Sequence, residues 1–397
     1  MGVGLIKPET VMRISLPLAE LPKPSADAIA HSARLKELIR AEIAQAGGAI
    51  GFERYMELAL YAPGLGYYSA GARKFGAAGD FVTAPELSPL FARCLAVQCA
   101  EVLGALGGGD ILELGAGSGR MATELLKELA RLGAPPRHYL ILEVSADLRE
   151  RQRQEIAAQA AQWQDQVHWL ERLPEELCGV VVGNEVLDAL PVCRFRRAAA
   201  GFEEFCVSCA GEEFAWQLRP ATGERHAALT ALEASLPRPF AQDYCSEICL
   251  RLPAFIHTLA DALTRGALLF TDYGYPRAAY YHPERHLGTL MCHYRQRAHD
   301  DPFLYPGLQD ITAHVDFTAV AEAGTCAGLQ LAGYTTQAHF LLALGIAALA
   351  TDLKTAREVK LLTLPGEMGE RFKAMGFQKG IELPLHGFAL RDLSYSL

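Results

Sequence analysis

The sequence predicts an α/β fold, a mostly parallel sheet with helices on both faces. Between residues 110 and 185, apolar segments typical of buried strands alternate with segments of helical spacing. Such alternation indicates parallel strands joined by crossover helices. A chain of 397 residues exceeds a typical single domain, so we also expect segments outside this sheet.

The part before residue 106 is predicted to be a helical extension. Residues 1–30 contain four prolines and are expected to form a flexible leader. Residues 31–105 follow as an N-terminal helical region, in which 34–48 has helical spacing and a glycine stop. A second helix within 51–68 is expected to end in a Pro-Gly turn.

The sheet is expected in two segments, residues 106–190 and 264–397. In the first segment, strands are predicted at 110–114 and 139–143, each followed by a helix, at 118–131 and 146–160. Two more strands are predicted at 167–170 and 179–185. The second begins with a buried-strand pattern, "GALLFTDYG", at 266–274. Its closing strands are predicted at 329–337 and 383–391.

Residues 191–263 interrupt this order and are predicted to form an inserted α+β subdomain that contacts a substrate or partner. Two stretches of period-2 alternation around Gly211 indicate a hairpin within 192–218. A helical segment is expected to follow as far as the second part of the sheet.

Charge and hydropathy argue against nucleic-acid and membrane partners. The chain has 37 Lys and Arg against 46 Asp and Glu, so a phosphate-binding surface would need a local basic patch. The one candidate patch is the His- and Arg-rich stretch 275–299. The longest apolar run, "FLLALGIAALA" from Phe340, is too short to span a bilayer, so no membrane insertion is predicted.

Ten scattered cysteines indicate reduced thiols, and the N-terminus lacks signal-peptide features, so a cytoplasmic location is predicted. No metal is expected. Zinc would need the pairs Cys206/Cys209 and Cys245/Cys249, but the first lies in a predicted strand and the second has a loose spacing. Three further candidate ligands, His293, His314 and Asp316, are predicted to be loop residues that bind no metal.

A glycine-rich turn follows the first predicted core strand. The sequence "ELGAGSG" places Gly115, Gly117 and Gly119 where a ligand can approach the backbone and the free N–H groups of a helix N-terminus. A dinucleotide fingerprint would need glycine or alanine at the position of Arg120, so NAD is disfavoured. A phosphate-binding P-loop sequence is absent.

Two acidic residues accompany this turn and point to S-adenosylmethionine as the cofactor. Glu113 lies two residues before the first glycine, and Glu143 ends the next predicted strand. A carboxylate at that second strand end can accept both ribose hydroxyls of an adenosine, while the turn admits its amino-acid tail. The alternative is that both glutamates only cap neighbouring helices.

Several blocks of sequence together resemble the MidA-like family of class I S-adenosylmethionine-dependent methyltransferases. They are "FERYMELALYAPGLGYY", "GAAGDFVTAPELSPLF", "ILELGAGSGRMATELL", "VVGNEVLDALPV", "FTDYG", "HLGTLMCHYRQRAHDDPF" and "GLQDITAHVDFTAV", in family order. The resemblance implies a seven-stranded Rossmann-like sheet. From its mitochondrial members it also implies arginine methylation of a subunit of respiratory complex I during assembly.

The block "GDFVTAPE" lies ahead of the first core strand, where it could fold over the methionine end of the cofactor. Its Asp80 and Thr83 are otherwise ordinary turn residues. The full set of predicted cofactor-binding residues is Asp80, Thr83, Pro85, Glu86, Glu113, Gly115, Ala116, Gly117, Gly119, Glu143, Val144, Asn184 and Glu185.

The block "GNEVLDALP" follows the fourth predicted strand, whose carboxyl end faces the ligand crevice of such a sheet. A spacing of three would put Glu185 and Asp188 on one side of a helical turn, where both could hold a planar guanidinium. The alternative is helix capping. The predicted catalytic residues are Asn184, Glu185 and Asp188, with Asp272 and Tyr273 at the end of the next strand.

The sequence therefore predicts a protein arginine methyltransferase linked to respiratory complex assembly, with a protein substrate. Two alternatives remain open. One is a methyltransferase for a small molecule or another side chain, and the other is an S-adenosylmethionine-binding assembly factor without essential catalysis. A homodimer is compatible with either.

Overall fold

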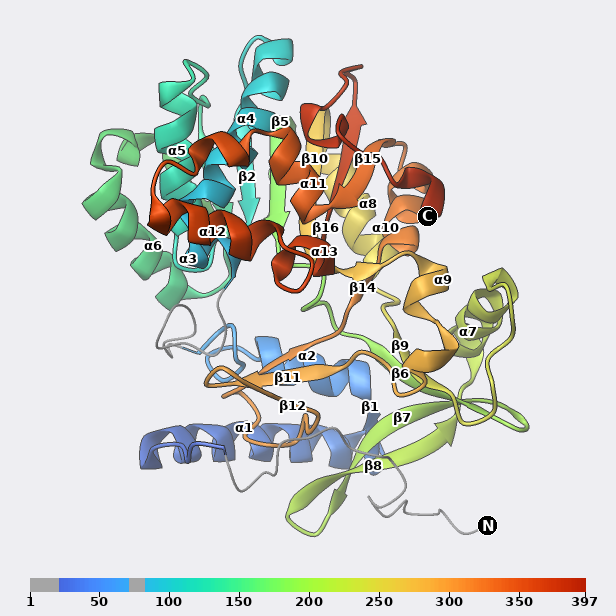
Figure 1. Cartoon of the computed structure of the whole chain (residues 1–397). Coiled ribbons are helices and arrows are strands. Elements are labelled where there is room, and N and C mark those ends of the chain that lie inside the picture. The colour runs from blue at the N-terminus through green and yellow to red at the C-terminus, as the bar shows by residue number, and fades with distance from the viewer. Residues whose placement is uncertain (1–20, 71–82) are drawn as a thin grey trace.

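The computed structural model describes residues 21–70 and 83–397. Figure 1 shows a large sheet with its helices in the upper part of the view and a second group of strands and helices below it. The chain crosses between these two parts several times, so residues distant in sequence meet where the parts adjoin.

The large sheet contains seven strands in the order β15-β16-β10-β5-β2-β3-β4. All its neighbouring pairs are parallel except those of β16, which runs antiparallel to β10 and β15. A short eighth strand, β14 (Val315–Asp316), pairs with β10. The strands are β2 (Asp110–Leu114), β3 (Tyr139–Leu142), β4 (Val167–Leu170), β5 (Leu177–Asn184), β10 (Leu263–Tyr275), β15 (Gln330–Thr336) and β16 (Phe372–Lys379).

Helices cover both faces of this sheet, as the alternating pattern predicted. Successive side chains of a strand point to opposite faces, so Ile111 and Leu112 of β2 belong to two separate hydrophobic clusters. One face is covered by α4 (Pro89–Leu106), α5 (Arg120–Arg131), α6 (Ala146–Gln159), α11 (Gln337–Ala343) and α12 (Leu353–Thr363). The other is covered by α8 (Leu252–Ala262) and α10 (Phe317–Cys326).

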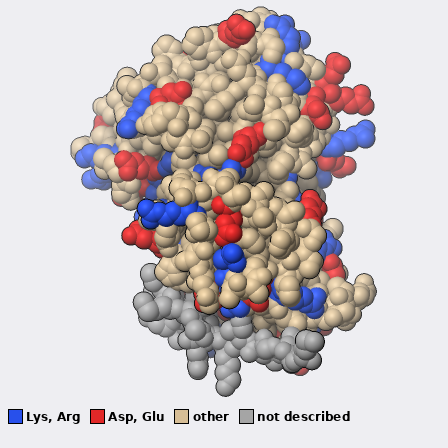
Figure 2. All heavy atoms as spheres, turned by 90° about the vertical axis from the view of Figure 1, so that its right-hand side faces the viewer, with Lys and Arg blue, Asp and Glu red and all other residues tan. Residues whose placement is uncertain are grey.

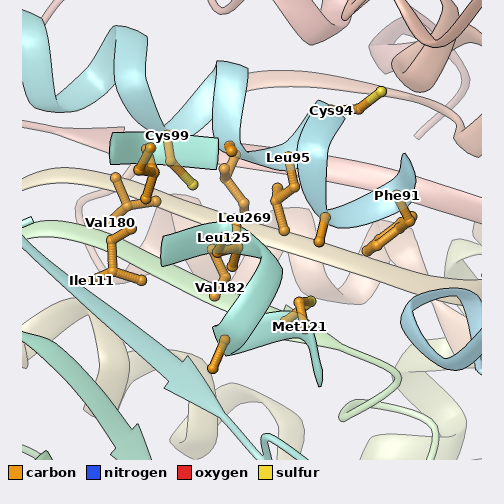
Figure 3. Close-up of a cluster of buried hydrophobic side chains, with 14 of the residues drawn as sticks. Phe91, Cys94, Leu95, Cys99, Ile111, Met121, Leu125, Val180, Val182 and Leu269 are labelled. Atoms are coloured by element: carbon orange, nitrogen blue, oxygen red, sulfur yellow. The ribbon is translucent and has the colours of Figure 1, made fainter. Parts of the chain in front are cut away.

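Helix α4 connects the N-terminal region to the sheet. Among the described residues, it is the one helix long and apolar enough to cross a membrane by length and composition. Its side chains Phe91, Leu95 and Cys99 instead lie in the buried cluster of Figure 3, beside residues of α5, β5 and β10. The core of the sheet therefore accounts for the apolar composition of α4.

The second part of the molecule contains a smaller sheet, in the order β1-β7-β6-β9 with β8 paired to β7. Helices α1 (Ala26–Gln45), α2 (Phe52–Tyr61) and α7 (Gly223–Ser235) pack around it. Its first strand comes from the N-terminal region, and its other four come from residues 193–248. The strands are β1 (Ala49–Gly51), β6 (Cys193–Ala198), β7 (Gly201–Ala210), β8 (Glu213–Pro220) and β9 (Cys245–Ile248).

A three-stranded sheet, β12-β11-β13, follows β10 in sequence and joins this second part. Cys292 of β11 and Ile311 of β13 share a hydrophobic cluster with Phe52 and Tyr55 of α2. Helix α2 and β13 are thereby held together close to the edge of the large sheet. The remaining elements are α3 (Ala84–Leu87), α9 (Arg277–Tyr280), α13 (Met368–Arg371), β11 (Met291–Tyr294), β12 (Arg297–His299) and β13 (Asp310–Thr312).

Three predictions about these elements need correction. The segment predicted as one hairpin around Gly211 forms three strands, β6, β7 and β8, and Gly211 lies in the turn between the last two. Strand β9 lies inside the segment predicted to be helical. His293 and Asp316, for which a loop role was predicted, lie in β11 and β14.

The predicted closing strand at 383–391 is wrong. The closing strand is β16, whose sequence "FKAMGFQK" is buried from its second to its seventh residue because it lies between β10 and β15. Residues 386–388 form a short 3-10 helix instead. Their Phe388 ring covers the sheet where Gly333 and Gly376 leave no side chain, so its apolar character serves packing across the sheet.

Candidate active site

A cavity of about 320 Å³ opens at the carboxyl ends of β2, β3 and β5. This is where open parallel sheets bind ligands, and the volume falls within the range of small-molecule sites. The predicted site residues that line it are Thr83, Pro85, Glu86, Glu113, Gly115, Ala116, Gly117, Glu143, Val144, Asn184 and Glu185. Asp80 lies outside the described residues.

The glycine turn forms one wall of this cavity. Gly115 and Gly117 have φ angles of 61° and 53°, in the left-handed region that favours glycine. Gly119, with φ of 88°, does not line the cavity. A Cβ atom at Gly119 would lie 3.2 Å from the Cα atom of Gln152, so this glycine lets α6 approach the start of α5.

Glu143 is held at the cavity by a network that the sequence analysis missed. Its carboxylate accepts hydrogen bonds from the Ser145 backbone N–H at 2.9 Å and from Gln152 Nε2 at 3.2 Å. Gln152 Nε2 also donates to the Gly117 carbonyl at 3.0 Å, and Gln152 Oε1 accepts from Trp169 Nε1 at 2.9 Å. Gln152 thus fixes the distance between the glycine turn and the acidic strand end.

Glu113 is buried beneath the turn. Its carboxylate accepts a hydrogen bond from the Tyr139 hydroxyl at 2.6 Å, which ties β2 to β3. Burial raises the pKa of Glu113 to about 7, against the opposing effect of the Tyr139 hydrogen bond.

Helix α3 closes over the glycine turn through Glu86. The Ser118 hydroxyl donates to the Glu86 carboxylate, and Arg120 Nη1 donates to the Glu86 carbonyl at 2.7 Å. Arg120 stands at the position where a dinucleotide fingerprint would need glycine or alanine. Its side chain instead anchors the segment carrying Thr83 and Pro85 beside the turn.

The loop after β5 presents Glu185 to the cavity. Glu185 has a φ of 53°, an uncommon conformation for a non-glycine residue that is enriched at functional sites. Its N–H donates to the Thr271 carbonyl at 2.8 Å, and Asn184 Nδ2 donates to its carboxylate at 3.1 Å. Thr271 in turn donates to Asn184 Oδ1 at 2.7 Å, so a short chain of hydrogen bonds orients the carboxylate.

The carboxyl groups of this loop have raised pKa values. Burial, and next the charge of Asp188, raises the pKa of Glu185 to about 8. Burial raises the pKa of Asp188 to about 6, although a hydrogen bond from the Tyr273 hydroxyl opposes the shift. Asp188 and Tyr273 lie behind the cavity lining. The helical turn predicted to carry Glu185 and Asp188 is absent, because the chain turns at Glu185 without continuing as a helix.

Asp272 also lies behind the loop, where it organises the backbone. Its Oδ2 atom accepts hydrogen bonds from the N–H groups of Val186, Leu187 and Asp188 at 3.1, 2.9 and 3.2 Å. Its Oδ1 atom accepts from the Tyr273 N–H at 2.9 Å. Asp272 therefore acts as a positioning residue.

The residues weighed as metal ligands have other contacts. Asp316 caps α10 through the N–H groups of Thr318 and Ala319 and pairs with Arg277 at 3.2 Å. Within residues 21–70 and 83–397, no group of three or more His, Cys, Asp or Glu side chains could hold a metal ion. Of the two cysteines on β7 that a zinc site would need, Cys206 is buried and Cys209 is exposed.

The basic stretch 275–299 is partly neutralised within the chain. Arg277 pairs with Asp316 and Glu322, and the Arg285 guanidinium lies 3.9 Å from the centroid of the Tyr275 ring. On the face of the molecule in Figure 2, basic and acidic side chains are interspersed.

Comparison with known proteins places this site in a family. A family described as "Putative S-adenosyl-L-methionine-dependent methyltransferase" matches residues 94–335, more than half of the chain. The chain belongs to this family. The resemblance to MidA-like methyltransferases and the predicted class I fold are thus confirmed, and the predicted cofactor, S-adenosylmethionine, is that of the family.

A solved structure gives closer detail. A protein from Burkholderia thailandensis with bound S-adenosyl-homocysteine is 48% identical, with a TM-score of 0.90, over 95% of this chain and 100% of that chain. Among curated proteins, the mitochondrial protein arginine methyltransferase NDUFAF7 homolog of Drosophila melanogaster is 27% identical, over 94% of this chain and 92% of the relative. Protein arginine methyltransferase NDUFAF7 of Danio rerio is 28% identical, over 86% and 89%.

The residues of the cavity fit the family's cofactor. Glu143 offers a buried, oriented carboxylate for ribose hydroxyls, and the glycine turn leaves the backbone accessible beside it. Asn184, Glu185 and Val186 of the loop after β5 line the same cavity.

Proposed function

We propose that this protein binds S-adenosylmethionine and transfers its methyl group to an arginine side chain of a protein substrate. The observation that carries the arginine assignment is the buried carboxyl group of Glu185, which lines the cavity, with the carboxyl group of Asp188 behind it. Among the described residues, no Lys or Arg forms an ion pair with Glu185 or Asp188. Buried carboxylates are costly without a cationic partner, and a guanidinium is a planar cation that carboxylates bind by forked hydrogen bonds.

The names of the curated relatives support the same substrate class. The link to respiratory complex assembly follows from the family resemblance, and it stays a prediction together with the cytoplasmic location.

In this proposal some residues bind the cofactor, and Glu185 binds the methyl acceptor and accepts its proton. S-adenosylmethionine would supply a methyl group on a positively charged sulfonium: the lone pair of the acceptor nitrogen attacks the methyl carbon, the C–S bond breaks, and S-adenosyl-homocysteine leaves as the neutral thioether. Glu143 would hold the ribose hydroxyls, and the glycine turn would hold the amino-acid tail. Glu185 accepts N–H hydrogen bonds from the guanidinium and localises its positive charge away from the attacking nitrogen.

Glu185 is also placed to accept the proton that the methylated nitrogen must release. Forming the new N–C bond leaves one proton in excess on the attacking nitrogen, and the product guanidinium keeps its single positive charge only if that proton leaves. A pKa near 8 makes Glu185 a competent acceptor around neutral pH. The cationic substrate favours the ionised form of Glu185 before transfer.

The test has two steps. The protein is incubated with radiolabelled S-adenosylmethionine and a lysate of its own cell, and mass spectrometry locates the labelled residue. Glu185→Gln keeps the shape of the side chain but cannot ionise. It should leave S-adenosyl-homocysteine affinity nearly unchanged and reduce transfer by roughly a hundredfold or more. Glu150→Gln, at an exposed position of α6, is the matched control.

Label on a residue other than arginine, or transfer at the wild-type rate by Glu185→Gln, would refute the arginine assignment. The assembly-factor alternative differs in the cell, because it expects Glu185→Gln to support the cellular function in full.

A further inference from the structure

We propose that Tyr61 and Tyr68 form the specificity wall of the acceptor site, an aromatic surface on which the guanidinium of the substrate stacks. This inference rests on the proposed function and names the residues that would select a planar cation.

Both rings line the same cavity as Glu185. Their centroids lie 5.5 Å apart and their planes are inclined by 24°, so the rings are stacked. Tyr61 ends α2 and Tyr68 lies in the turn that follows it. The surface is therefore supplied by the N-terminal extension, outside the sheet and the glycine turn.

Each ring is fixed by its hydroxyl. The Tyr61 hydroxyl donates to the Ala189 carbonyl at 2.9 Å, in the loop that carries Glu185. The Tyr68 hydroxyl lies 2.9 and 3.0 Å from the two carboxylate oxygens of Asp310 in β13. The Ala313 N–H also donates to the Asp188 carbonyl at 3.0 Å, so the segment after β13 is tied to the same loop. The wall and the Glu185 loop are thus held as one unit.

Two acidic side chains, Asp310 and Asp188, lie near the wall. Burial, followed by the charges of Asp310 and Asp188, raises the pKa of both tyrosines, so their hydroxyls remain neutral donors. Asp310 is only 2% exposed. An aromatic face beside buried carboxylates attracts a cation through both its quadrupole and the surrounding field.

The shape of the surface favours arginine over lysine. A guanidinium is planar, stacks on aromatic faces and is weakly hydrated, whereas an ammonium is compact and strongly hydrated. A stacked guanidinium can keep its in-plane N–H groups directed at a carboxylate such as that of Glu185. Two tyrosines from the N-terminal extension would therefore add side-chain selection to a core that binds the cofactor.

The experiment measures binding without turnover. The full chain is saturated with S-adenosyl-homocysteine, and the affinities of N-acetyl-arginine amide, N-acetyl-citrulline amide and N-acetyl-lysine amide are measured by calorimetry or NMR titration. The arginine probe should bind best, because citrulline has nearly the same shape without the charge and lysine lacks the plane. Equal binding of all three probes would overturn the proposal.

The variants separate the wall from the cofactor site. Tyr61→Leu and Tyr68→Leu should each weaken binding of the arginine probe by roughly five- to thirtyfold and leave S-adenosyl-homocysteine affinity unchanged. Tyr61→Phe keeps the ring and should retain most of the affinity. Tyr395→Leu, at a tyrosine that is 80% exposed, is the control for general effects.

If the leucine variants fold but bind the arginine probe as tightly as the wild type does, the two tyrosine rings do not bind the guanidinium and the proposal is overturned. If they lose S-adenosyl-homocysteine instead, the tyrosines belong to the cofactor site and the proposal is overturned. Failure of the proposed function would look different, because a labelled residue other than arginine could coexist with a wall that binds the arginine probe. Phe variants of both tyrosines keep the test valid if a leucine variant does not fold.

Discussion

The side-chain amide of Gln152 donates to Glu143 Oε2 at 3.2 Å and to the Gly117 carbonyl, so one residue joins the glycine turn to the carboxylate predicted to bind the ribose. Gln152→Ala should lower S-adenosyl-homocysteine affinity by roughly three- to tenfold, because a hydrogen bond contributes about 0.5–1.5 kcal/mol. Glu143→Ala should lower it further, since hydrogen bonds to a charged group contribute about 1.5–3 kcal/mol. Calorimetry measures both changes.

Gln154→Ala is the control for this pair, because Gln154 lies on the same helix and contacts the exposed Glu150. Unchanged affinity in both Gln152→Ala and Glu143→Ala would mean that the cofactor occupies another part of the cavity.

A second prediction concerns Asp272. Both of its oxygens accept backbone N–H groups, three at Oδ2 and one at Oδ1. An asparagine side chain has one acceptor oxygen, so in Asp272→Asn the side-chain NH₂ group would face a backbone N–H that now donates to a carboxylate oxygen. We expect a loss of about 1–3 kcal/mol in the free energy of unfolding, measured by urea titration. Methyl transfer should fall with it, because the Glu185 loop loses its support.

Asp165→Asn, at an exposed position before β4, should leave the free energy of unfolding unchanged. An Asp272→Asn variant with wild-type stability and wild-type transfer would show that the loop holds its shape without Asp272.

The sequence allowed the cofactor half of the site to be predicted because its signals are local. The glycine turn, Glu143 and Glu185 each follow a strand whose apolar pattern is clear, and strand ends of one direction meet at one edge. Gln152 and Asp272 act through contacts between elements. Gln152 is a polar residue in a polar helix, so its burial gave no signal.

Strand β16 was missed for the same reason, because its burial depends on contacts with other elements. β16 lies between two strands and is covered by helices on both faces, so its sequence lacks the alternation of a half-buried strand. Phe388 and its neighbours are apolar because they cover that sheet, and their pattern therefore imitated a strand. Tyr61 lies just before the predicted Pro-Gly turn, but only the packing of α2 against β13 brings it to the cavity.

The cysteines give a third prediction. Cys206 is buried and Cys209 exposed on β7, where residues three apart point to opposite faces, so one metal ion cannot bind both without distorting the strand. We expect the purified protein to contain no stoichiometric zinc and its melting temperature to be unaffected by chelators. Elemental analysis that finds one zinc per chain would overturn this expectation.

The last prediction links Glu185 to stability and pH. Its carboxyl pKa is about 8 in the folded protein against an ordinary value of 4.5. The folded state therefore holds a proton that the unfolded state has lost between these values, and wild-type stability falls as pH rises from about 4.5 to about 8. Glu185→Gln cannot ionise, so this loss should vanish. Its melting temperature relative to wild type should rise steadily with pH, from a small difference at pH 4.5.

Thermal unfolding without ligand, at several pH values, measures this difference, and Glu150→Gln should show no such trend. A variant more stable but less active than wild type at alkaline pH would indicate that the buried carboxylate is kept for function at the expense of stability. If Glu185→Gln instead loses stability as pH rises, Glu185 is ionised and favourably paired in the free protein. The carboxyl group would then already have a cationic partner without the substrate, and the arginine assignment would be refuted.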